Sequence, residues 1–146
     1  MKICLRFLLV SFLLLTPVKV ICEENKSQSG NFQELQSQIK AIISDQISAF
    51  KTADIERAYR HASESIKSIF PNSKIFVTMV RKSYPMIWNP KSYEFLHTVE
   101  ATEGILQRVM FTDQNGKMHF FDYALENNGN RWVIAGVFLV DGGLGA

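Results

Sequence analysis

Four residues in the last third of the chain have side chains that could do chemistry together: Arg108, His119, Asp122 and Tyr123. An arginine binds a carboxylate through two parallel hydrogen bonds. A histidine or an aspartate can act as a general base near neutral pH, and a tyrosine hydroxyl can donate to a developing enolate. Whether these groups meet depends on the strands that carry them.

The C-terminal part of the sequence predicts an antiparallel sheet. Four runs are rich in Phe, Tyr, Val and Ile, which favours strands. Asn115-Gly116 and Asn128-Gly129 separate the last three runs, and such dipeptides suit two-residue hairpin turns, in which both central residues take positive φ. The predicted strands span residues 91–99, 105–112, 117–126 and 131–140.

Two-residue loops at both turns fix the predicted register of the last three strands. Gln114 then pairs with Lys117, and counting back places Arg108 opposite Tyr123. The second turn places Tyr123 opposite Ile134. A shift of one residue would move every side chain to the other face of its strand.

One face of the predicted sheet is bulky and aromatic, and we expect it to pack against the helices. This inner face contains Leu106, Arg108, Met110, His119, Phe121, Tyr123, Leu125, Trp132, Ile134 and Phe138. The outer face is smaller but still mostly apolar, whereas a solvated face would carry more charge. It contains Gln107, Val109, Phe111, Phe120, Asp122, Ala124, Val133, Ala135, Val137 and Leu139. Because no helix is left to cover it, we predict a homodimer through the outer face.

The N-terminal half of the folded region is predicted to be helical. Apolar residues recur at three- and four-residue spacing over residues 32–50, which is typical of an amphipathic helix. Asp54 and Ser63 are suitable N-caps for two short helices, and Ser73 starts a fourth. Helices followed by a curved antiparallel sheet of about four strands define the α+β class.

The first 22 residues have the pattern of a signal peptide. Lys2 and Arg6 form a positive start, and the apolar stretch 7–15 is far shorter than the roughly 20 residues of a membrane-spanning helix. We therefore expect export, to the periplasm or the medium, and no membrane span.

Cleavage after Cys22 would leave a polar linker at residues 23–31 and a single domain at 32–146. Ile21 precedes this cysteine where a lipidation signal has a small residue, so a lipid anchor is not expected. The remaining chain would carry 13 Lys and Arg against 14 Asp and Glu. This balance does not favour a nucleic-acid partner.

The sequence also resembles known families. The order of elements resembles the nuclear transport factor 2-like cone fold, which ketosteroid isomerase and polyketide cyclases share. Residues 76–85 (FVTMVRKSYP), 88–90 (WNP) and 131–137 (RWVIAGV) are similar to the bacterial family known as domain of unknown function 4864. The resemblance covers residues 38–141 and implies a cone-shaped domain, but it transfers no activity, because one fold hosts many functions.

A cone fold can build an apolar cavity with a few convergent polar groups. On the predicted register Arg108 points into it beside Tyr123, although an arginine at the rim with its charge in water is the commoner arrangement. Met79, Tyr84 and Trp88 are expected near the cavity, either as a lid or as core. No cofactor is expected, and no metal, since the sequence has no histidine pair at metal spacing, no cysteine pair and no phosphate loop.

Three functions remain open from the sequence. The first is a non-catalytic module that binds a small apolar or weakly acidic molecule. The second is an isomerase, dehydratase or cyclase in which Asp122 or His119 is the base and Tyr123 the donor. Asp122 becomes the leading candidate if the two faces are inverted. The third is a structural periplasmic protein that binds a protein partner. His61 and His97 are taken as structural.

Overall fold

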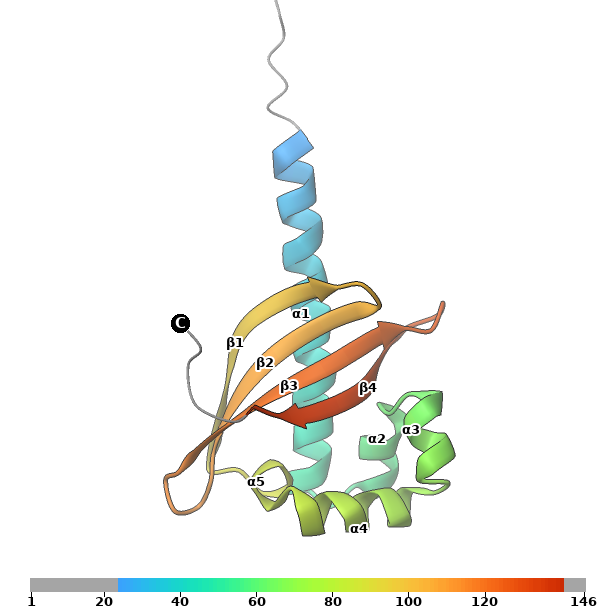
Figure 1. Ribbon diagram of the computed structural model, residues 1–146, viewed down its shortest axis with the longest axis vertical. Helices are drawn as coiled ribbons and strands as arrows, with labels where there is room; N and C mark the ends of the chain where they lie inside the picture. Colours follow the sequence, from blue (N-terminus) through green and yellow to red (C-terminus); the bar gives the residue numbers. More distant parts are fainter. Residues whose placement is uncertain (1–23, 141–146) are drawn as a thin grey trace, which may run out of the picture.

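The computed structural model describes residues 24–140, with side chains from residue 28. The predicted signal peptide and Cys22 lie outside the described residues. Helices precede a four-stranded antiparallel sheet with strand order β1-β2-β3-β4, which confirms the predicted α+β class (Figure 1). The elements are α1 (Glu24–Lys51), α2 (Ile55–Arg60), α3 (Glu64–Ile69), α4 (Ser73–Ser83), α5 (Pro85–Trp88), β1 (Ser92–Ala101), β2 (Gly104–Thr112), β3 (Met118–Asn127) and β4 (Trp132–Leu139).

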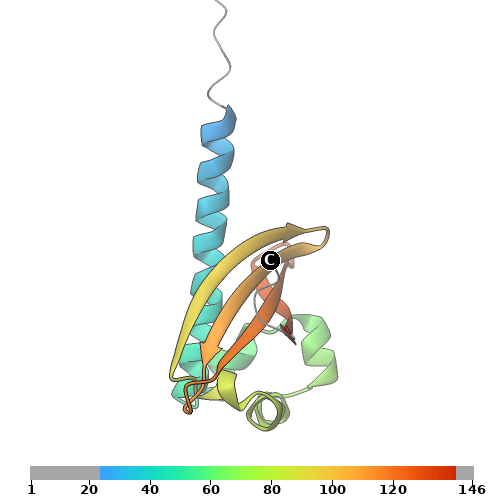
Figure 2. The same cartoon turned by 60° about the vertical axis from the view of Figure 1, so that its left-hand side comes forward.

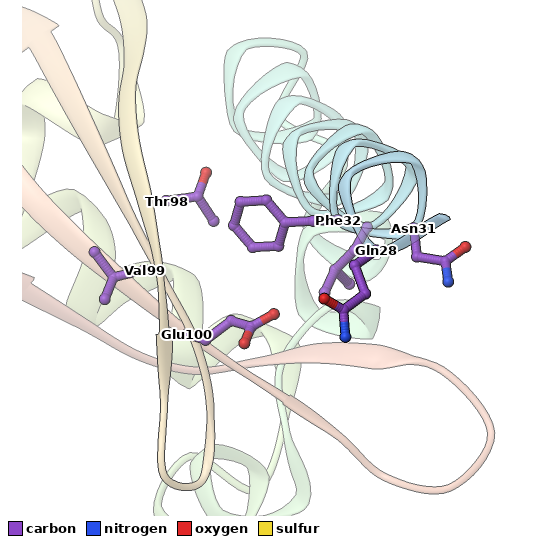
Figure 3. Close-up of a pocket in the computed structure, with 7 residues that line it drawn as sticks. Gln28, Asn31, Phe32, Thr98, Val99 and Glu100 are labelled. Atoms are coloured by element: carbon purple, nitrogen blue, oxygen red, sulfur yellow. The ribbon is translucent and has the colours of Figure 1, made fainter. Parts of the chain in front are cut away.

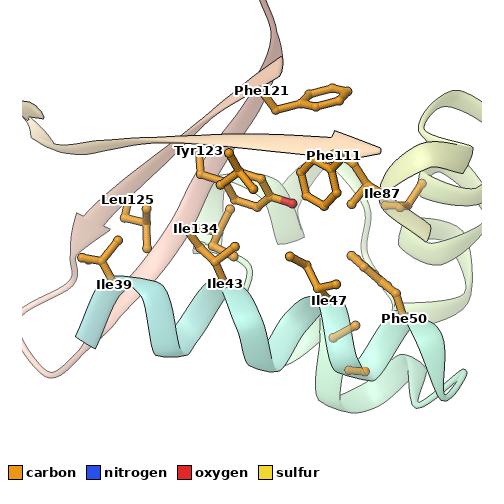
Figure 4. Packing of buried hydrophobic residues seen from close by; sticks show 14 of the residues in the cluster. Ile39, Ile43, Ile47, Phe50, Ile87, Phe111, Phe121, Tyr123, Leu125 and Ile134 are labelled. Carbon is orange, nitrogen blue, oxygen red and sulfur yellow. The ribbon is translucent and has the colours of Figure 1, made fainter. Parts of the chain in front are cut away.

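The long helix α1 lies along one face of the sheet, and its N-terminal turns project beyond the sheet (Figures 1 and 2). We call the face against α1 the inner face and the opposite one the outer face. Ile39, Ile43 and Ile47 face the sheet with at most 1% of their surface exposed (Figure 4). The prediction that the helix begins near Phe32 is wrong. Residues 24–31, predicted as a linker, form its first turns, which are polar and therefore carry no apolar stripe.

The short helices begin where capping residues predict. Asp54 accepts a hydrogen bond from the backbone of Arg57, and Ser63 accepts one from Ile66, so both predicted caps are confirmed. Asn72, and not Ser73, caps α4. The helix α5 was not predicted. α4 and α5 lie at one end of the sheet and α2 and α3 lie beside β4 (Figure 1).

The first hairpin turn differs from the predicted one. Thr112 pairs with Met118, and Asp113 pairs with Lys117 through a 2.9 Å backbone hydrogen bond. The loop is therefore three residues long, and only Gly116 takes a positive φ, of 84°. The Asp113 carboxylate stabilises this turn because it accepts hydrogen bonds from the backbone of Asn115 and Lys117.

This extra loop residue moves β2 by one position against β3. Arg108 lies opposite Asp122 and not opposite Tyr123, so the predicted register of this pair is wrong. The faces of β2 are consequently inverted, because successive side chains of a strand point to opposite sides. The inner residues of β2 are Ile105, Gln107, Val109 and Phe111, and the outer ones are Leu106, Arg108 and Met110. The faces of β3 are as predicted.

The second hairpin also differs, and a bulge follows it. Leu125 pairs with Ile134, but Ala124 pairs with Gly136, so Ala135 is an extra residue in β4. Beyond the bulge Tyr123 pairs with Val137, not with Ile134 as predicted. Val137 therefore packs on the inner side, and Phe138, predicted inner, pairs with outer Asp122 and is 58% exposed.

The inner face contains one buried polar side chain that is fully bonded. Gln107 has no exposed surface and lies opposite a bulge in β1 between Phe95 and Thr98. Its amide nitrogen donates to the carbonyls of His97 at 3.2 Å and of Arg108 at 2.8 Å, and Thr98 donates to its oxygen at 2.6 Å. The bulge thus supplies the partners that a buried glutamine requires.

Candidate functional site

A cavity of about 280 Å³ lies between the helices and the β3–β4 edge of the sheet. Its size is near the lower end of ordinary small-molecule sites, which run from about 300 Å³. The wall is mostly apolar and comes from α1, α3, α4, α5, β3 and β4. It consists of Gln46, Phe50, Ile66, Phe70, Phe76, Met79, Val80, Tyr84, Ile87, Tyr123, Ile134, Ala135, Gly136, Val137 and Phe138.

Tyr123 is one of the lining residues, and it carries an unpaired polar group that is itself buried. The residue has no exposed surface, and its hydroxyl is the one buried polar side-chain atom in the described part of the chain without a hydrogen-bond partner. In Figure 4 the hydroxyl points toward the end of the sheet where Phe50 and Ile87, two other lining residues, lie. Burial raises the pKa of Tyr123 far above its ordinary value of 10.0, so the hydroxyl stays protonated.

Gln46 is the second polar residue of the wall. It is 2% exposed, and its amide nitrogen donates to the carbonyl of Ala58 at 3.3 Å. That bond connects α1 to α2 and holds the amide at the cavity. Gln46 interrupts the apolar stripe of α1 between Ile43 and Phe50, at helical spacing from both. A polar residue on an apolar helix face is the sequence signal that could have identified it.

Aromatic contacts build the helical side of the cavity. Phe76 of α4 has its ring centroid 6.2 Å from that of Phe50 and 6.2 Å from that of Phe70. Tyr84 packs edge-on against Phe121 of the sheet, at 5.9 Å. These contacts bring α1, α4 and β3 to a common apolar wall.

The segment between α2 and α3 fixes the β4 side of the cavity. Ile134 donates to the carbonyl of His61 at 2.7 Å and accepts from the backbone of Ser63 at 2.9 Å. His61 also contacts Asp45 of α1, with 2.6 Å between Nε2 and Oδ2. The position of Ile134 in the wall is thereby tied to the helices, and part of the free edge of β4 is paired.

Arg108 and Asp122 lie on the outer face, away from the cavity. The two side chains form a bidentate pair, with Nε–Oδ1 and Nη2–Oδ2 distances of 2.8 Å. The hydrogen bond from Arg108 lowers the pKa of Asp122 below its ordinary value of 3.8. The prediction that Arg108 points inward beside Tyr123 is wrong, because the real loop of the first hairpin is one residue longer.

His119 is bonded within its own hairpin. Its Nε2 lies 2.8 Å from Oδ2 of Asp113, and its side chain is 13% exposed. The hydrogen bond from His119 also lowers the pKa of Asp113. His119 is not among the residues that line the cavity.

Of the three other predicted site residues, Met79 and Tyr84 line the cavity and Trp88 does not. The Trp88 ring instead packs 5.5 Å from Phe50, and Arg81 lies over it at 5.1 Å. Trp88 therefore packs on the lining residue Phe50 without lining the cavity itself.

A second hollow lies between the projecting part of α1 and β1 (Figure 3). It is larger, about 740 Å³, but it is an open groove lined largely by exposed residues, including Gln28, Asn31, Val99 and Glu100. The smaller cavity is instead lined mostly by buried and half-buried apolar side chains, so we take it as the candidate site.

No group of three or more His, Cys, Asp or Glu side chains is placed to hold a metal ion within residues 24–140. None of the helices in this same part of the chain is long and apolar enough to cross a membrane.

The fold and the cavity together define an α+β domain with a small, mostly apolar site between its helices and its sheet. The family model "Domain of unknown function (DUF4864)" matches residues 32–143, and the chain belongs to this family. No curated protein and no solved structure matches the chain. The predicted likeness to the nuclear transport factor 2-like cone fold thus stays a prediction.

Proposed function

We propose that this protein is an exported, non-catalytic module that binds a small, mostly apolar molecule in the cavity at Tyr123. One observation carries the proposal: a mostly apolar cavity of about 280 Å³ between the helices and the sheet. Sites for small molecules are typically apolar hollows of about this size with few polar groups.

The composition of the wall supports binding over acid/base catalysis. The cavity is lined by two tyrosines and a glutamine, but by no carboxylate, histidine, lysine or arginine. General acid/base catalysis needs a group that changes protonation near the working pH. Asp122 and His119, the predicted bases, are each bonded to a partner outside the cavity.

A matched pair of variants tests the binding proposal. Val137→Phe would fill the cavity, whereas Ile75→Phe adds the same ring on α4 at a position that is 47% exposed. We expect α-methylstyrene, an apolar aromatic probe, to shift the methyl NMR signals of Ile134 in the wild type and in Ile75→Phe. The shifts should vanish in Val137→Phe. Absence of shifts in the wild type, or their persistence in Val137→Phe, would contradict the proposal.

We also propose that the outer face forms a homodimer. After correction of the register this face still carries the apolar side chains of Leu106, Met110 and Phe120, and Val99, which pairs with Leu106, is 48% exposed. Arg108 and Asp122 at its centre neutralise each other, which lowers the cost of burying them, and Glu94 beside Met110 is the charge that a partner would have to leave in solvent. An apolar face of this kind supports contact with a second copy.

Oligomeric state tests the dimer directly. Met110→Glu places a charge on the outer face, and Ile69→Glu places one on α3, where Ile69 is 68% exposed. We expect light scattering to give a dimer for the wild type and Ile69→Glu and a monomer for Met110→Glu. A monomeric wild type would reject the proposal.

Export rests on the N-terminal pattern alone. Expression of the full chain in a Gram-negative host should yield a periplasmic protein whose mass shows removal of about the first 22 residues. Full-length protein in the cytoplasm would contradict export.

A further inference from the structure

We propose that the end of the domain formed by α3 and α4 binds the surface of a bilayer that contains anionic lipids. We call this part of the protein the helical end surface, and it consists of Ile69, Lys74, Ile75, Arg81 and Lys82. Its cations contact the lipid headgroups, and its two isoleucines enter the acyl region below them. This proposal goes beyond ligand binding in the cavity and does not depend on it.

Charge is distributed unevenly between the helical and the sheet parts of the domain. Residues 51–91, which include α2, α3, α4 and α5, contain eight Lys and Arg against three Asp and Glu. Residues 92–140, which form the sheet, contain three Lys and Arg against six Asp and Glu. The separation gives the helical part a positive field, which attracts an anionic surface.

The exposed side of α4 carries cations without an acidic partner. Lys74, Arg81 and Lys82 are exposed, lie on one side of the helix and form no salt bridge with another described residue. The guanidinium of Arg81 lies over the ring of Trp88 at 5.1 Å, and this contact leaves its charge in place. α4 lies at the end of the molecule opposite the projecting turns of α1, where a flat surface can reach it (Figures 1 and 2).

The three acidic residues of the segment 51–91 have partners of their own. Asp54 accepts a backbone hydrogen bond at the start of α2, and Glu56 accepts one from the buried Ser73. Glu64 pairs with Lys67 at 3.0 Å. The charge of α4 is therefore not neutralised within the described part of the protein.

Two isoleucines are exposed beside these cations. Ile69 ends α3 and Ile75 lies in the first turn of α4, on either side of the short loop 70–72. They are 68% and 47% exposed, and 68% is the highest value of any large apolar side chain among the described residues. Single exposed apolar residues are ordinary, but two that flank one loop beside cations match a surface that enters the lipid interface.

The mixture of lysine and isoleucine favours a lipid surface over other anionic partners. Protein interfaces are depleted of lysine and enriched in aromatic residues. Nucleic-acid backbones bind cations, and exposed aliphatic side chains gain nothing from phosphate contacts. A bilayer suits both groups because its anionic headgroups lie directly above hydrocarbon. α3 and α4 also line the cavity, through Ile66 and Phe76, so binding brings the cavity near the phase in which apolar molecules dissolve.

Cosedimentation with vesicles tests the role of charge. The vesicles consist of phosphatidylcholine, alone or with about one third phosphatidylglycerol, at an ionic strength of about 0.1 M. Lys74→Gln/Lys82→Gln should bind the anionic vesicles about 25-fold more weakly than the wild type, because each cation near such a surface contributes about a factor of five. Lys40→Gln/Lys117→Gln removes the same charge elsewhere and should bind within about twofold of the wild type. All variants keep the same N-terminus, so residues 7–15 contribute equally to each.

The isoleucines separate a lipid surface from a polyanion. Ile69→Ser and Ile75→Ser should each weaken binding to the anionic vesicles about fivefold. Leu139→Ser, at a position on β4 that is 52% exposed, should change it less than about twofold. No binding of the wild type to anionic vesicles, equal binding to both kinds of vesicle, or an equal loss in the two lysine pairs would overturn the proposal. Undiminished binding of both isoleucine variants would overturn it as well, because the surface would then recognise charge alone, as a site for a nucleic acid or an acidic protein does.

Discussion

The outer and inner faces of the sheet each place a polar group of β3 among apolar neighbours. On the outer face, Asp122 is held by two hydrogen bonds from Arg108 and is partly exposed. On the inner face, the neighbouring Tyr123 is fully buried and its hydroxyl is unpaired. The two residues are adjacent in sequence, but only the outer one has a hydrogen-bond partner. Neighbouring positions on one strand thus differ in burial and in hydrogen bonding because their side chains point to opposite faces.

The largest expected effect is a difference in unfolding free energy between alanine substitutions on the inner and the outer face. Phe111→Ala removes a fully buried inner ring that contacts Phe121 and Tyr123, and should lower the free energy of unfolding by about 3–5 kcal/mol. Met110→Ala, its outer neighbour, should cost less than about 1 kcal/mol. Urea unfolding at concentrations at which the chain is monomeric measures both. Similar costs would break the assignment of faces.

A double-mutant cycle tests the corrected register on the outer face. Arg108→Ala, Asp122→Ala and the double variant should show a coupling energy of about 1 kcal/mol, because the pair is bidentate and only partly exposed. The predicted register would have placed Arg108 opposite Tyr123 and given no such coupling. Additive effects in the cycle would therefore favour that register.

Removal of the unpaired Tyr123 hydroxyl should stabilise the fold, whereas the substitutions above destabilise it. Tyr123→Phe removes a buried group without a partner and should raise the free energy of unfolding by up to about 1 kcal/mol in the absence of ligand. Tyr59→Phe is the control, because the Tyr59 hydroxyl donates to Phe70 at 2.6 Å, and it should destabilise by about as much. A clear loss of stability in Tyr123→Phe would show that the hydroxyl is paired.

Acid should reduce the stability that the Arg108–Asp122 pair contributes on the outer face. The folded-state pKa of Asp122 is lowered, so its pair with Arg108 contributes stability that is complete above the ordinary pKa of 3.8 and is lost as the pH falls below it. In urea titrations between pH 5 and pH 2, Asp122→Asn should lose less stability than the wild type. An identical pH dependence in the two proteins would show that the pair adds nothing.

Alkali should affect the inner face instead, by a similarly small amount. Tyr123 stays protonated in the folded protein, whereas in the unfolded chain it loses its proton near pH 10.0. Unfolding then releases a proton, so stability falls as the pH rises above that value. Tyr123→Phe should flatten this alkaline limb. A slope equal to that of the wild type would contradict the burial of the Tyr123 hydroxyl.

Much of the fold followed from local sequence patterns. Every strand end was predicted to within two residues, and the caps at Asp54 and Ser63 were found, because alternation and capping are local properties. The register of β2 against β3 was not predicted correctly, because it depends on whether the loop at Asn115-Gly116 has two or three residues. The Asp113 carboxylate favours the longer loop, and that single residue inverted the faces of β2.

The candidate site was predictable only in part. Tyr123, Tyr84 and Met79 were named from the sequence and do line the cavity, whereas Arg108 was misplaced with its strand. Gln46 was missed because only the apolar residues of its helix were considered, and the polar residue among them was not. Whether any of these residues binds a ligand stays a prediction.

The amino-acid sequence by itself determined the order of helices and strands and the membership in the family, because spacing and short motifs are written along the chain. Only the tertiary structure decided which polar groups find partners. Asp122 accepts hydrogen bonds from Arg108 of the neighbouring strand, and Gln107 donates to a carbonyl in the bulge of β1. The Tyr123 hydroxyl has no hydrogen-bond partner among the described residues. Hydrogen bonds are satisfied by atoms that folding brings close, and a shift of one residue in a single loop changes all of these partners.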